Sequence, residues 1–496
     1  MEKPETIREK EAIRLPKEEE ITTAYEEGRE AVVKLFKNTF ELLVEHIQKL
    51  EDQLAKNSRN SGKPPSSDGY NQPAPRSLRK RQRRKSGGQV GHRGETLKAV
   101  ANPDHVKVHV VQECEPCGTS LKRQTVIRYE KRQVFDSPKV QIEITEHRAE
   151  IKGCPCCQKE TRAAFPSEVS KAVQYGTEIK AQMAYLNTEQ HIPLERICDL
   201  LEEFYSHRPS EGTIVTACAQ AAQAVEETNA AVKEHLVEHE QVGHFDETGM
   251  MINGVLNWLH TASTPHLTCY AMHVKRGRVA MNEIGILPRF KGRAVHDDLA
   301  AYFLYELDHA LCNPPHLRTL LFLLERYPQK WIEPLKDLLL KIKAKVEAAK
   351  EKMQTALSFR QRNYFRQAYD RLIAQGLRAN PPPNEKSRKP GQRGRLKQSP
   401  ARNLLLRLRE HKEAVLAFLY DFNVPFDNNQ AERDLRMMKI KQKVSGGFRS
   451  IQGAQNFCQI RGYLSTARKN GMKALAALRL AFDHQPVLPE FVAPLH

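Results

Sequence analysis

The sequence predicts a multidomain α+β protein, and three observations support this fold class. The chain has 496 residues, more than one hydrophobic core usually supports, so we expect roughly three or four domains. A heptad repeat of apolar residues near the N-terminus indicates a long helix with a narrow apolar face. After position 238, runs with strand-like alternation are followed by long segments of helical periodicity, a pattern typical of an α/β domain with added helices.

The composition is basic, with 78 Lys and Arg against 60 Asp and Glu and a formal charge of +18. This excess favours a polyanionic partner such as double-stranded DNA, although a basic solvated surface would give the same balance. The opening residues, MEKPETIREKEAIRL, are charged where a secretory signal would be apolar. No apolar stretch approaches the ~20 residues that span a bilayer, so we expect a cytoplasmic protein without a membrane partner.

An apolar seam predicts a coiled coil over residues 30–57. Its members are separated by alternating steps of three and four residues, with charged residues between them. They are Val33, Phe36, Phe40, Leu43, Ile47, Leu50 and Leu54. We name these residues the heptad seam and expect it to join copies of the chain, with packing inside one domain as the alternative. The helix should end at Asn57, where Ser, Pro, Gly and Asn become frequent.

A basic, flexible linker is predicted over residues 58–104. Its densest part, residues 76–85 (RSLRKRQRRK), holds seven cations in ten positions and no acid. We name this segment the basic tract and expect it to run along a phosphate backbone, with a solvated tether as the alternative. The cations assigned to DNA binding are Arg79, Lys80, Arg81, Arg83, Arg84 and Lys85.

Residues 105–160 are expected to form a small zinc ribbon. Two cysteine pairs with metal-ligand spacing flank a segment of β-like alternation. The proposed ligands of one Zn²⁺ ion are Cys114, Cys117, Cys154 and Cys157. Four thiolates suit tetrahedral zinc, and the metal would stabilise a domain with little core. Cys156 competes for the fourth position, and buried free thiols are the alternative.

Residues 170–236 have the spacing of a helix-turn-helix. One helix is expected after Pro193, a turn at SHRPS, and a second helix capped by Ser210. The second helix offers no Arg or Lys to read bases, so a plain helical hairpin remains the alternative.

A catalytic core is predicted in two parts, residues 238–325 and residues 401–484. Three consecutive strands are expected at QVGHFDETGMM, VLNWLHTAS and LTCYAMHV, the first two joined by a hairpin at Asn253 and Gly254. RAVHDD is expected to form a fourth strand, followed by an apolar helix from Leu299.

Two aspartates are candidates for metal binding in this core. Asp246 would lie within the first strand and Asp297 at the end of the fourth, on one rim of a mixed sheet. An RNase H-like fold places its metal ligands in this way. Each aspartate alone is more commonly a turn or cap residue, so the shared setting is what indicates a metal site.

Residues 326–400 are interpreted as a helical insertion that ends in a second cationic linker. Beyond it, Asp427, Asn428 and Asn429 are good N-cap candidates for a helix with Glu432 in its first turn. The helix dipole alone also favours an acid at this position. Cations suited to phosphate follow on the same helix, at Arg433, Arg436 and Lys439.

The motifs together resemble those of the transposase of the IS66 family of bacterial insertion sequences, from the heptad seam to about residue 480. Those that carry the resemblance are the two cysteine pairs, SRNSGKPPSSDG, GGQVGHRGETL, HIPLERI, HFDET, HALCNPPHLR, PFDNNQAERDLRMMKIKQK and LSTARKNG. The resemblance implies a DDE transposase in which Asp246, Asp297 and Glu432 hold two Mg²⁺ or Mn²⁺ ions. It also implies binding to terminal inverted repeats and strand transfer into target DNA. We expect a nucleoid-associated oligomer of at least two copies, and companion proteins of the element are possible partners.

Two positions depart from the family pattern. Asp298 stands where relatives usually have Gly, and we prefer Asp297 because it directly follows the Val-His of the strand and keeps the register to Tyr302. Pro315 stands where members often place His, and His316 follows it, which puts the activity of this copy in question. A non-catalytic DNA-binding regulator, a nuclease that does not join strands, and a coiled-coil scaffold are the rival functions.

Overall fold

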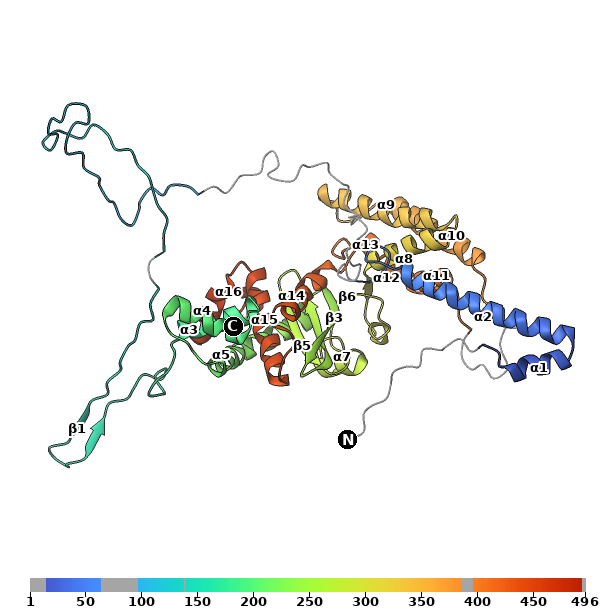
Figure 1. Cartoon of the computed structure of the whole chain (residues 1–496), viewed down its shortest axis with the longest axis horizontal. Coiled ribbons are helices and arrows are strands. Elements are labelled where there is room, and N and C mark those ends of the chain that lie inside the picture. The colour runs from blue at the N-terminus through green and yellow to red at the C-terminus, as the bar shows by residue number, and fades with distance from the viewer. Residues whose placement is uncertain (1–14, 64–96, 138–139, 385–395, 493–496) are drawn as a thin grey trace. The chain divides into compact units, whose positions relative to one another are not determined.

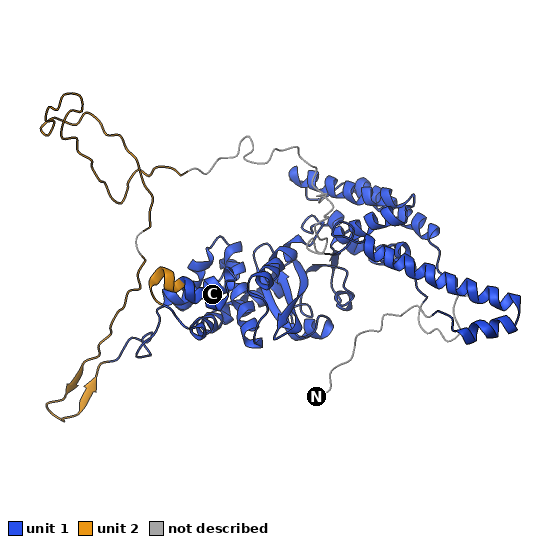
Figure 2. Ribbon diagram, in the orientation of Figure 1, with its two compact units in different colours: residues 1–75, 164–200, 208–496 blue, residues 76–163, 201–207 orange. Residues whose placement is uncertain are grey.

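The computed structural model describes residues 15–63, 97–137, 140–384 and 396–492 (Figure 1). The basic tract and residues 385–395 of the second cationic linker lie outside these ranges. The chain divides into a large unit, residues 1–75, 164–200 and 208–496, and a small unit, residues 76–163 and 201–207 (Figure 2). No helix in the described part of the chain is long and apolar enough to cross a membrane.

The small unit contains two similar cysteine turns. In the first, Cys114 N donates to Thr119 O over 2.9 Å, and in the second Cys154 N donates to Lys159 O over 2.9 Å. The second turn joins the antiparallel strands β1 (Ile151–Gly153) and β2 (Glu160–Arg162). The prediction of β-structure between the two cysteine turns is wrong for the described residues, except for the short strand β1. Side chains such as Ile127 and Ile144 are more than 90% exposed, so no apolar face forms on which a sheet could pack.

The large unit begins with two helices, α1 (Glu18–Glu26) and α2 (Arg29–Ala55). The heptad repeat correctly predicts α2, whereas α1 was not predicted. No residue of the fully described helix α2 is buried, and the heptad seam lies on its surface. The C-terminal end of α2 is attached to the end of α8 (Asn313–Arg326). Glu51 pairs with Arg326 at 2.9 Å, and Asp52 accepts a hydrogen bond of 2.5 Å from the Tyr327 hydroxyl.

A helical layer follows, and the expected pair of helices is present. It contains α3 (Thr177–Ala184), the π-helical turn η2 (Tyr185–Glu189), α4 (Leu194–Tyr205), α5 (Glu211–Ala224) and α6 (Glu226–His239). Ser210 caps α5 by accepting a 3.2 Å hydrogen bond from Thr213 N. The buried face of α5 packs on α3, α15 (Ile451–Lys469) and α16 (Ala474–Phe482). A role of α4 and α5 in DNA binding stays a prediction.

A five-stranded mixed sheet forms the centre of the large unit, in the order β5-β4-β3-β6-β7. The strands are β3 (Val242–Ile252), β4 (Val255–Ser263), β5 (Thr268–His273), β6 (Arg293–His296) and β7 (His309–Leu311). The first three are antiparallel, and β6 and β7 run parallel to β3. Asn253 and Gly254 both have positive φ, 47° and 75°, as the predicted two-residue hairpin requires.

Helices cover both faces of this sheet. On one face, Phe245 packs with residues of α6 and of α7 (Arg278–Ile284). On the other face, Met250 and Leu259 pack beneath α14 (Asn429–Ser445) and α15, which Figure 1 shows beside the strands. The helix expected from Leu299 is wrong: only the short 3₁₀ turn η3 (Tyr302–Leu304) forms there.

The insertion is helical, as expected, but it shares its core with the sheet. It contributes α9 (Ile332–Glu351) and α10 (Phe359–Ala379), and α11 (Pro400–Glu410), α12 (Lys412–Val415) and α13 (Ala417–Tyr420) follow. One apolar cluster runs from Trp331 and Tyr369 in this region to Val295 and Leu311 on β6 and β7. The chain ends, within the described residues, with the turn η5 (Glu490–Val492).

Candidate active site

Asp246 and Asp297 lie on neighbouring parallel strands. β3 and β6 pair with His244 opposite Val295, so continuing this register brings Asp246 level with Asp297, the first residue after β6. Side chains alternate along β3, and Asp246 therefore shares a face with Met250, the face covered by α14 and α15. Sequence reasoning placed both aspartates in these positions.

The carboxyl of Asp246 has a strongly perturbed acidity. Burial above all, together with the nearby charges of Glu247, Asp297 and Glu432, raises its pKa from 3.8 to about 7. A 2.8 Å hydrogen bond from Glu247 N to Asp246 Oδ1 opposes this increase. The other two predicted acids, Asp297 and Glu432, are therefore close enough for their charges to act on Asp246. Carboxylates that repel one another in this way form a donor set that suits a divalent cation.

A second buried carboxylate, Glu247, was missed by sequence reasoning. Its side chain is fully buried, and its two oxygens accept hydrogen bonds from Tyr302 Oη (2.6 Å) and Arg276 Nε (2.7 Å). Arg276 also reaches Asp297, with Nη2 3.7 Å from Oδ2, and stacks on the Trp258 ring at 5.0 Å. Burial raises the pKa of Glu247, whereas both donors lower it. Glu247 belongs to the motif HFDET, but sequence reasoning assigned it no role.

Asp297 and Asp298 face different neighbours. Asp297 Oδ1 accepts a 3.0 Å hydrogen bond from Leu299 N, and its charge acts on Asp246. Asp298 instead forms an ion pair with Arg407 of α11. The choice of Asp297 rather than Asp298 as a metal ligand stays a prediction.

Glu432 lies in the first turn of α14, as the sequence predicts. The residue as a whole is exposed, but partial burial of its carboxyl raises the pKa. The positive charge of Arg318 on α8 lowers this pKa, and the negative charge of Asp427 raises it. No hydrogen bond from the described residues reaches this carboxylate. Among the described residues, no three His, Cys, Asp or Glu side chains are gathered closely enough to hold a metal ion. Glu432 is thus near Asp246 without completing a closed site.

Asn428 and His316 are buried polar residues of the large unit. The Asn428 side chain does not cap α14; its Nδ2 donates to Phe245 O and its Oδ1 accepts from His244 Nδ1, each over 2.8 Å. His316 is 1% exposed on α8, and its ring nitrogens have no hydrogen-bond partner among the described residues. Burial lowers the pKa of His316 to about 3. Pro315 lies in the first turn of α8, where a missing N–H is tolerated.

The cations expected to bind phosphate on α14 are accessible. Arg433, Arg436 and Lys439 are all exposed, and the charge of Arg436 lowers the pKa of Glu432. Lys439 Nζ is 3.4 Å from Gly249 O, a weak contact that leaves it available to solvent. Helix α14 therefore presents positive charge beside the acids.

The structure does not gather the four predicted zinc ligands into one group. Within the first turn, a hydrogen bond with Thr119 lowers the pKa of Cys117, and the neighbouring Cys114 thiol lowers it further. Within the second turn, hydrogen bonds from the Cys157 and Cys156 backbones lower the pKa of Cys154. Each turn is thus suited to thiolate formation, and the zinc ribbon stays a prediction.

Acidic side chains that meet at a mixed sheet, beside a cationic helix in a basic chain, have the features of an enzyme that acts on a polyanion. The comparison with known families is more specific. A family described as Transposase IS66 family matches residues 172–456, more than half of the sequence, and the chain belongs to this family. A family of unknown function, DUF6444, matches residues 13–98, which include α1 and α2.

One relative is an uncharacterized protein, y4jO, from Sinorhizobium fredii (strain NBRC 101917 / NGR234). It is 34% identical over 88 residues, which are 17% of this chain and 27% of the relative. The match therefore spans about a quarter of that relative's length.

Proposed function

We propose that this protein is a transposase that binds the terminal inverted repeats of its insertion sequence and carries out metal-dependent DNA cleavage and strand transfer. The observation that supports this function best is the position of Asp246 on β3, level with Asp297, where burial and then the charges of Glu247, Asp297 and Glu432 raise its pKa to about 7. The order of the mixed sheet supports an RNase H-like core. Membership of the transposase family supplies the reaction class.

Asp246, Asp297 and Glu432 would hold two Mg²⁺ or Mn²⁺ ions, because their mutual repulsion is relieved by positive charge. When bound, these ions supply an activated water or 3′-hydroxyl for in-line attack and stabilise the leaving oxygen. The protein's own residues orient the donors. Arg276 would orient both Asp297 and Glu247, because it pairs with each of these carboxylates. Tyr302 donates a hydrogen bond to the other carboxylate oxygen of Glu247.

DNA would be held by positive charge from several elements. Arg433, Arg436 and Lys439 on α14 would contact phosphates beside the acids, and the basic tract would add contacts that do not depend on sequence. A zinc ribbon held by the four cysteines, together with α4 and α5, would select the repeat. The heptad seam on α2 would pair two copies, so that two element ends are processed together.

A regulator that only binds DNA is the weaker alternative. Placing Asp246 and Glu247 side by side in a buried setting destabilises the folded protein, and DNA binding alone gains nothing from this arrangement. A nuclease that does not join strands would keep the same acids and differ in its products.

The test is a cleavage and joining assay with DNA that carries the flanking element's ends. Asp246→Asn, Asp297→Asn and Glu432→Gln should each abolish both products in Mg²⁺ while end binding, measured by gel shift, stays largely intact. The matched control is Asp298→Asn, which changes the same charge one residue away and should have a milder effect. Full joining by the Asp297 variant, with loss in the Asp298 variant, would show that the acids are misassigned. Cleaved ends that are never joined would favour the nuclease.

A further inference from the structure

Two polar connections fix the first turns of helix α14, one on each side of Glu432. Because no hydrogen bond from the described residues reaches the Glu432 carboxylate, its place depends on the helix that carries it. Asn428 connects the start of this helix to β3, and Asp434 connects the next turn to α15 and β5. Both connections are buried or nearly so.

The Asn428 connection leads directly to the strand of Asp246. The residue is 2% exposed, and its amide spans His244 and Phe245, the two residues before Asp246. Its backbone N–H also donates to Cys312 Sγ at 3.2 Å. A shift of the helix start relative to β3 would break these contacts and leave a buried amide unpaired.

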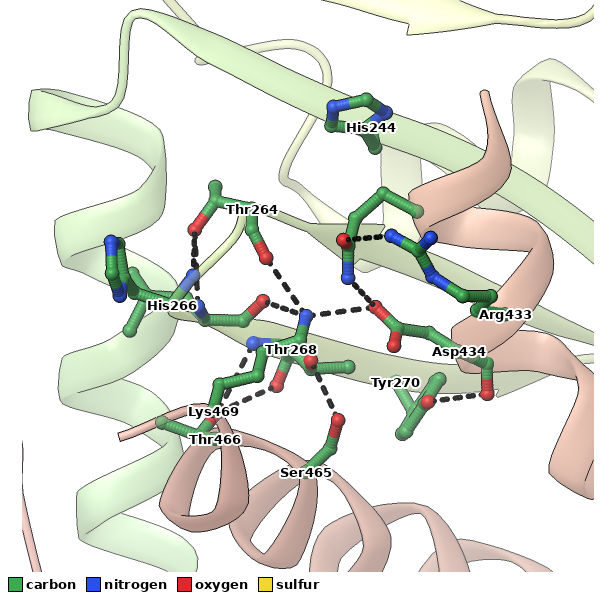
Figure 3. A network of polar contacts seen from close by, with 12 residues as sticks. His244, Thr264, His266, Thr268, Tyr270, Arg433, Asp434, Ser465, Thr466 and Lys469 are labelled. Atoms are coloured by element: carbon green, nitrogen blue, oxygen red, sulfur yellow. Dashed lines mark hydrogen bonds and ion pairs between the residues drawn. The ribbon is translucent and has the colours of Figure 1, made fainter. Parts of the chain in front are cut away.

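The Asp434 connection centres on Lys469, which lies at the end of α15 (Figure 3). The Lys469 ammonium donates to three acceptors at 2.8 Å each, Asp434 Oδ2 and the backbone oxygens of Thr264 and Leu267. The side chains of Asp434 and Lys469 are only 11% and 12% exposed. The ammonium can donate three hydrogen bonds, so its capacity is used.

Further contacts make this region rigid. Tyr270 Oη on β5 donates to Asp434 O at 2.6 Å, and Asp434 Oδ2 also accepts from Gln430 Nε2 at 3.0 Å. Thr466 Oγ1 of α15 accepts from Thr268 N at 3.1 Å. Figure 3 shows these side chains converging between α14, α15 and the β4–β5 turn.

We propose that Asn428 and the Asp434–Lys469 ion pair are positioning residues that set the carboxylate of Glu432 relative to Asp246. This inference rests on the proposed function of Glu432 as a metal ligand. The two connections hold α14 against the strand of Asp246 and against β5, so Glu432 can approach a shared ion without disordering its helix. Neither residue touches the reacting atoms.

The test measures Mn²⁺ binding to the metal-free, full-length protein, with free Mn²⁺ followed by electron paramagnetic resonance. Asn428→Ala and Asp434→Asn should each weaken Mn²⁺ binding by roughly 10-fold, the lower end of the loss seen when a direct partner of a metal ligand is removed, because both act on Glu432 only through its helix. Tyr270→Phe removes one hydroxyl that contacts the same turn and should weaken binding in the same direction by a smaller factor. This mild variant gives a result even if Asp434→Asn fails to fold.

A matched control separates positioning from general loosening. Glu189→Gln breaks another buried ion pair of α15, with Arg461, which does not involve α14. It should lower the melting temperature and leave Mn²⁺ affinity unchanged. Equal loss of Mn²⁺ affinity in this control would overturn the proposal, as would wild-type affinity in folded Asn428→Ala and Asp434→Asn proteins.

The Glu432→Gln background distinguishes this proposal from the function on which it rests. If Asp434 acts through Glu432, adding Asp434→Asn to Glu432→Gln should weaken Mn²⁺ binding no further. A full additional loss would overturn the positioning role while leaving Glu432 as a ligand. Wild-type Mn²⁺ affinity in Glu432→Gln alone would instead refute the metal-binding role of Glu432.

Discussion

Replacing Asp246 by Asn should stabilise the metal-free protein while it abolishes activity. The folded protein raises the pKa of this carboxyl from 3.8 to about 7, mainly through burial and then through the charges of Glu247, Asp297 and Glu432. Folding therefore favours the protonated form. Asn has the shape of that form, carries no charge, and its Oδ1 can still accept the hydrogen bond from Glu247 N.

The size of this effect follows from the shift in pKa. A difference of about three pH units, at ~1.4 kcal/mol for each, amounts to about 4 kcal/mol. Because the folded-state pKa is raised, the favourable contribution of the protonated group is complete below 3.8 and is lost as the pH rises through about 7. The free energy of unfolding of Asp246→Asn should thus exceed that of wild type by roughly 1–2 kcal/mol at about pH 5 and by roughly 4 kcal/mol at about pH 8.

The assay is urea unfolding in EDTA at both pH values, followed by tryptophan fluorescence. The two tryptophans report on the relevant regions, since Trp258 lies on β4 and Trp331 in the apolar cluster of the insertion. Glu178→Gln is the control, because hydrogen bonds from Arg479 lower the pKa of that carboxyl, so this variant should not stabilise the protein. Added Mn²⁺ should stabilise wild type only. A stability difference near zero, or one independent of pH, would refute the reasoning.

Three further predictions concern the parts outside the acidic site. Purified protein should contain about one Zn²⁺ per chain, and Cys117→Ser should release it without changing catalytic-core stability; elemental analysis that finds no zinc would contradict this. Replacing the six DNA-binding cations of the basic tract by Gln should flatten the salt dependence of DNA binding, whereas an unchanged slope of log affinity against log salt would mean a solvated tether. Phe40 is 60% exposed in the single chain, so replacing it should affect only self-association. Phe40→Glu should give monomers in analytical ultracentrifugation with an unchanged melting temperature, and dimers that persist would argue against the heptad seam.

Elements with strong local signals were predictable from the sequence. The heptad repeat predicted α2, and Asn253-Gly254 predicted the β3–β4 hairpin because both residues accept positive φ. Asp246 and Asp297 were placed because Asp246 lies within a recognisable strand and Asp297 directly follows another. Glu432 was placed in a first helical turn because N-cap candidates precede it, although the side chain at the N-cap position, Asn428, makes no capping hydrogen bond.

Other features depend on contacts that the local sequence does not record. The alternation before β1 failed to form strands because its apolar side chains meet no partner surface, and the apolar run after Leu299 forms only a short turn. Sequence reasoning assigned no role to Arg276 or Lys469, although Lys469 lies in the motif LSTARKNG. Their importance comes from the carboxylates that the fold brings to them, Glu247 and Asp434.

The position of Lys469 near the end of α15 bears on how the protein matures during synthesis. A ribosome releases Asp246, Asp297 and Glu432 well before it releases this lysine. Until α15 has emerged and packed, Asp434 lacks its ammonium partner, and the apolar residues beneath α15, such as Met438, remain uncovered. A copy truncated before α15 would therefore retain all three proposed metal ligands and yet lack the contacts that we propose to position Glu432.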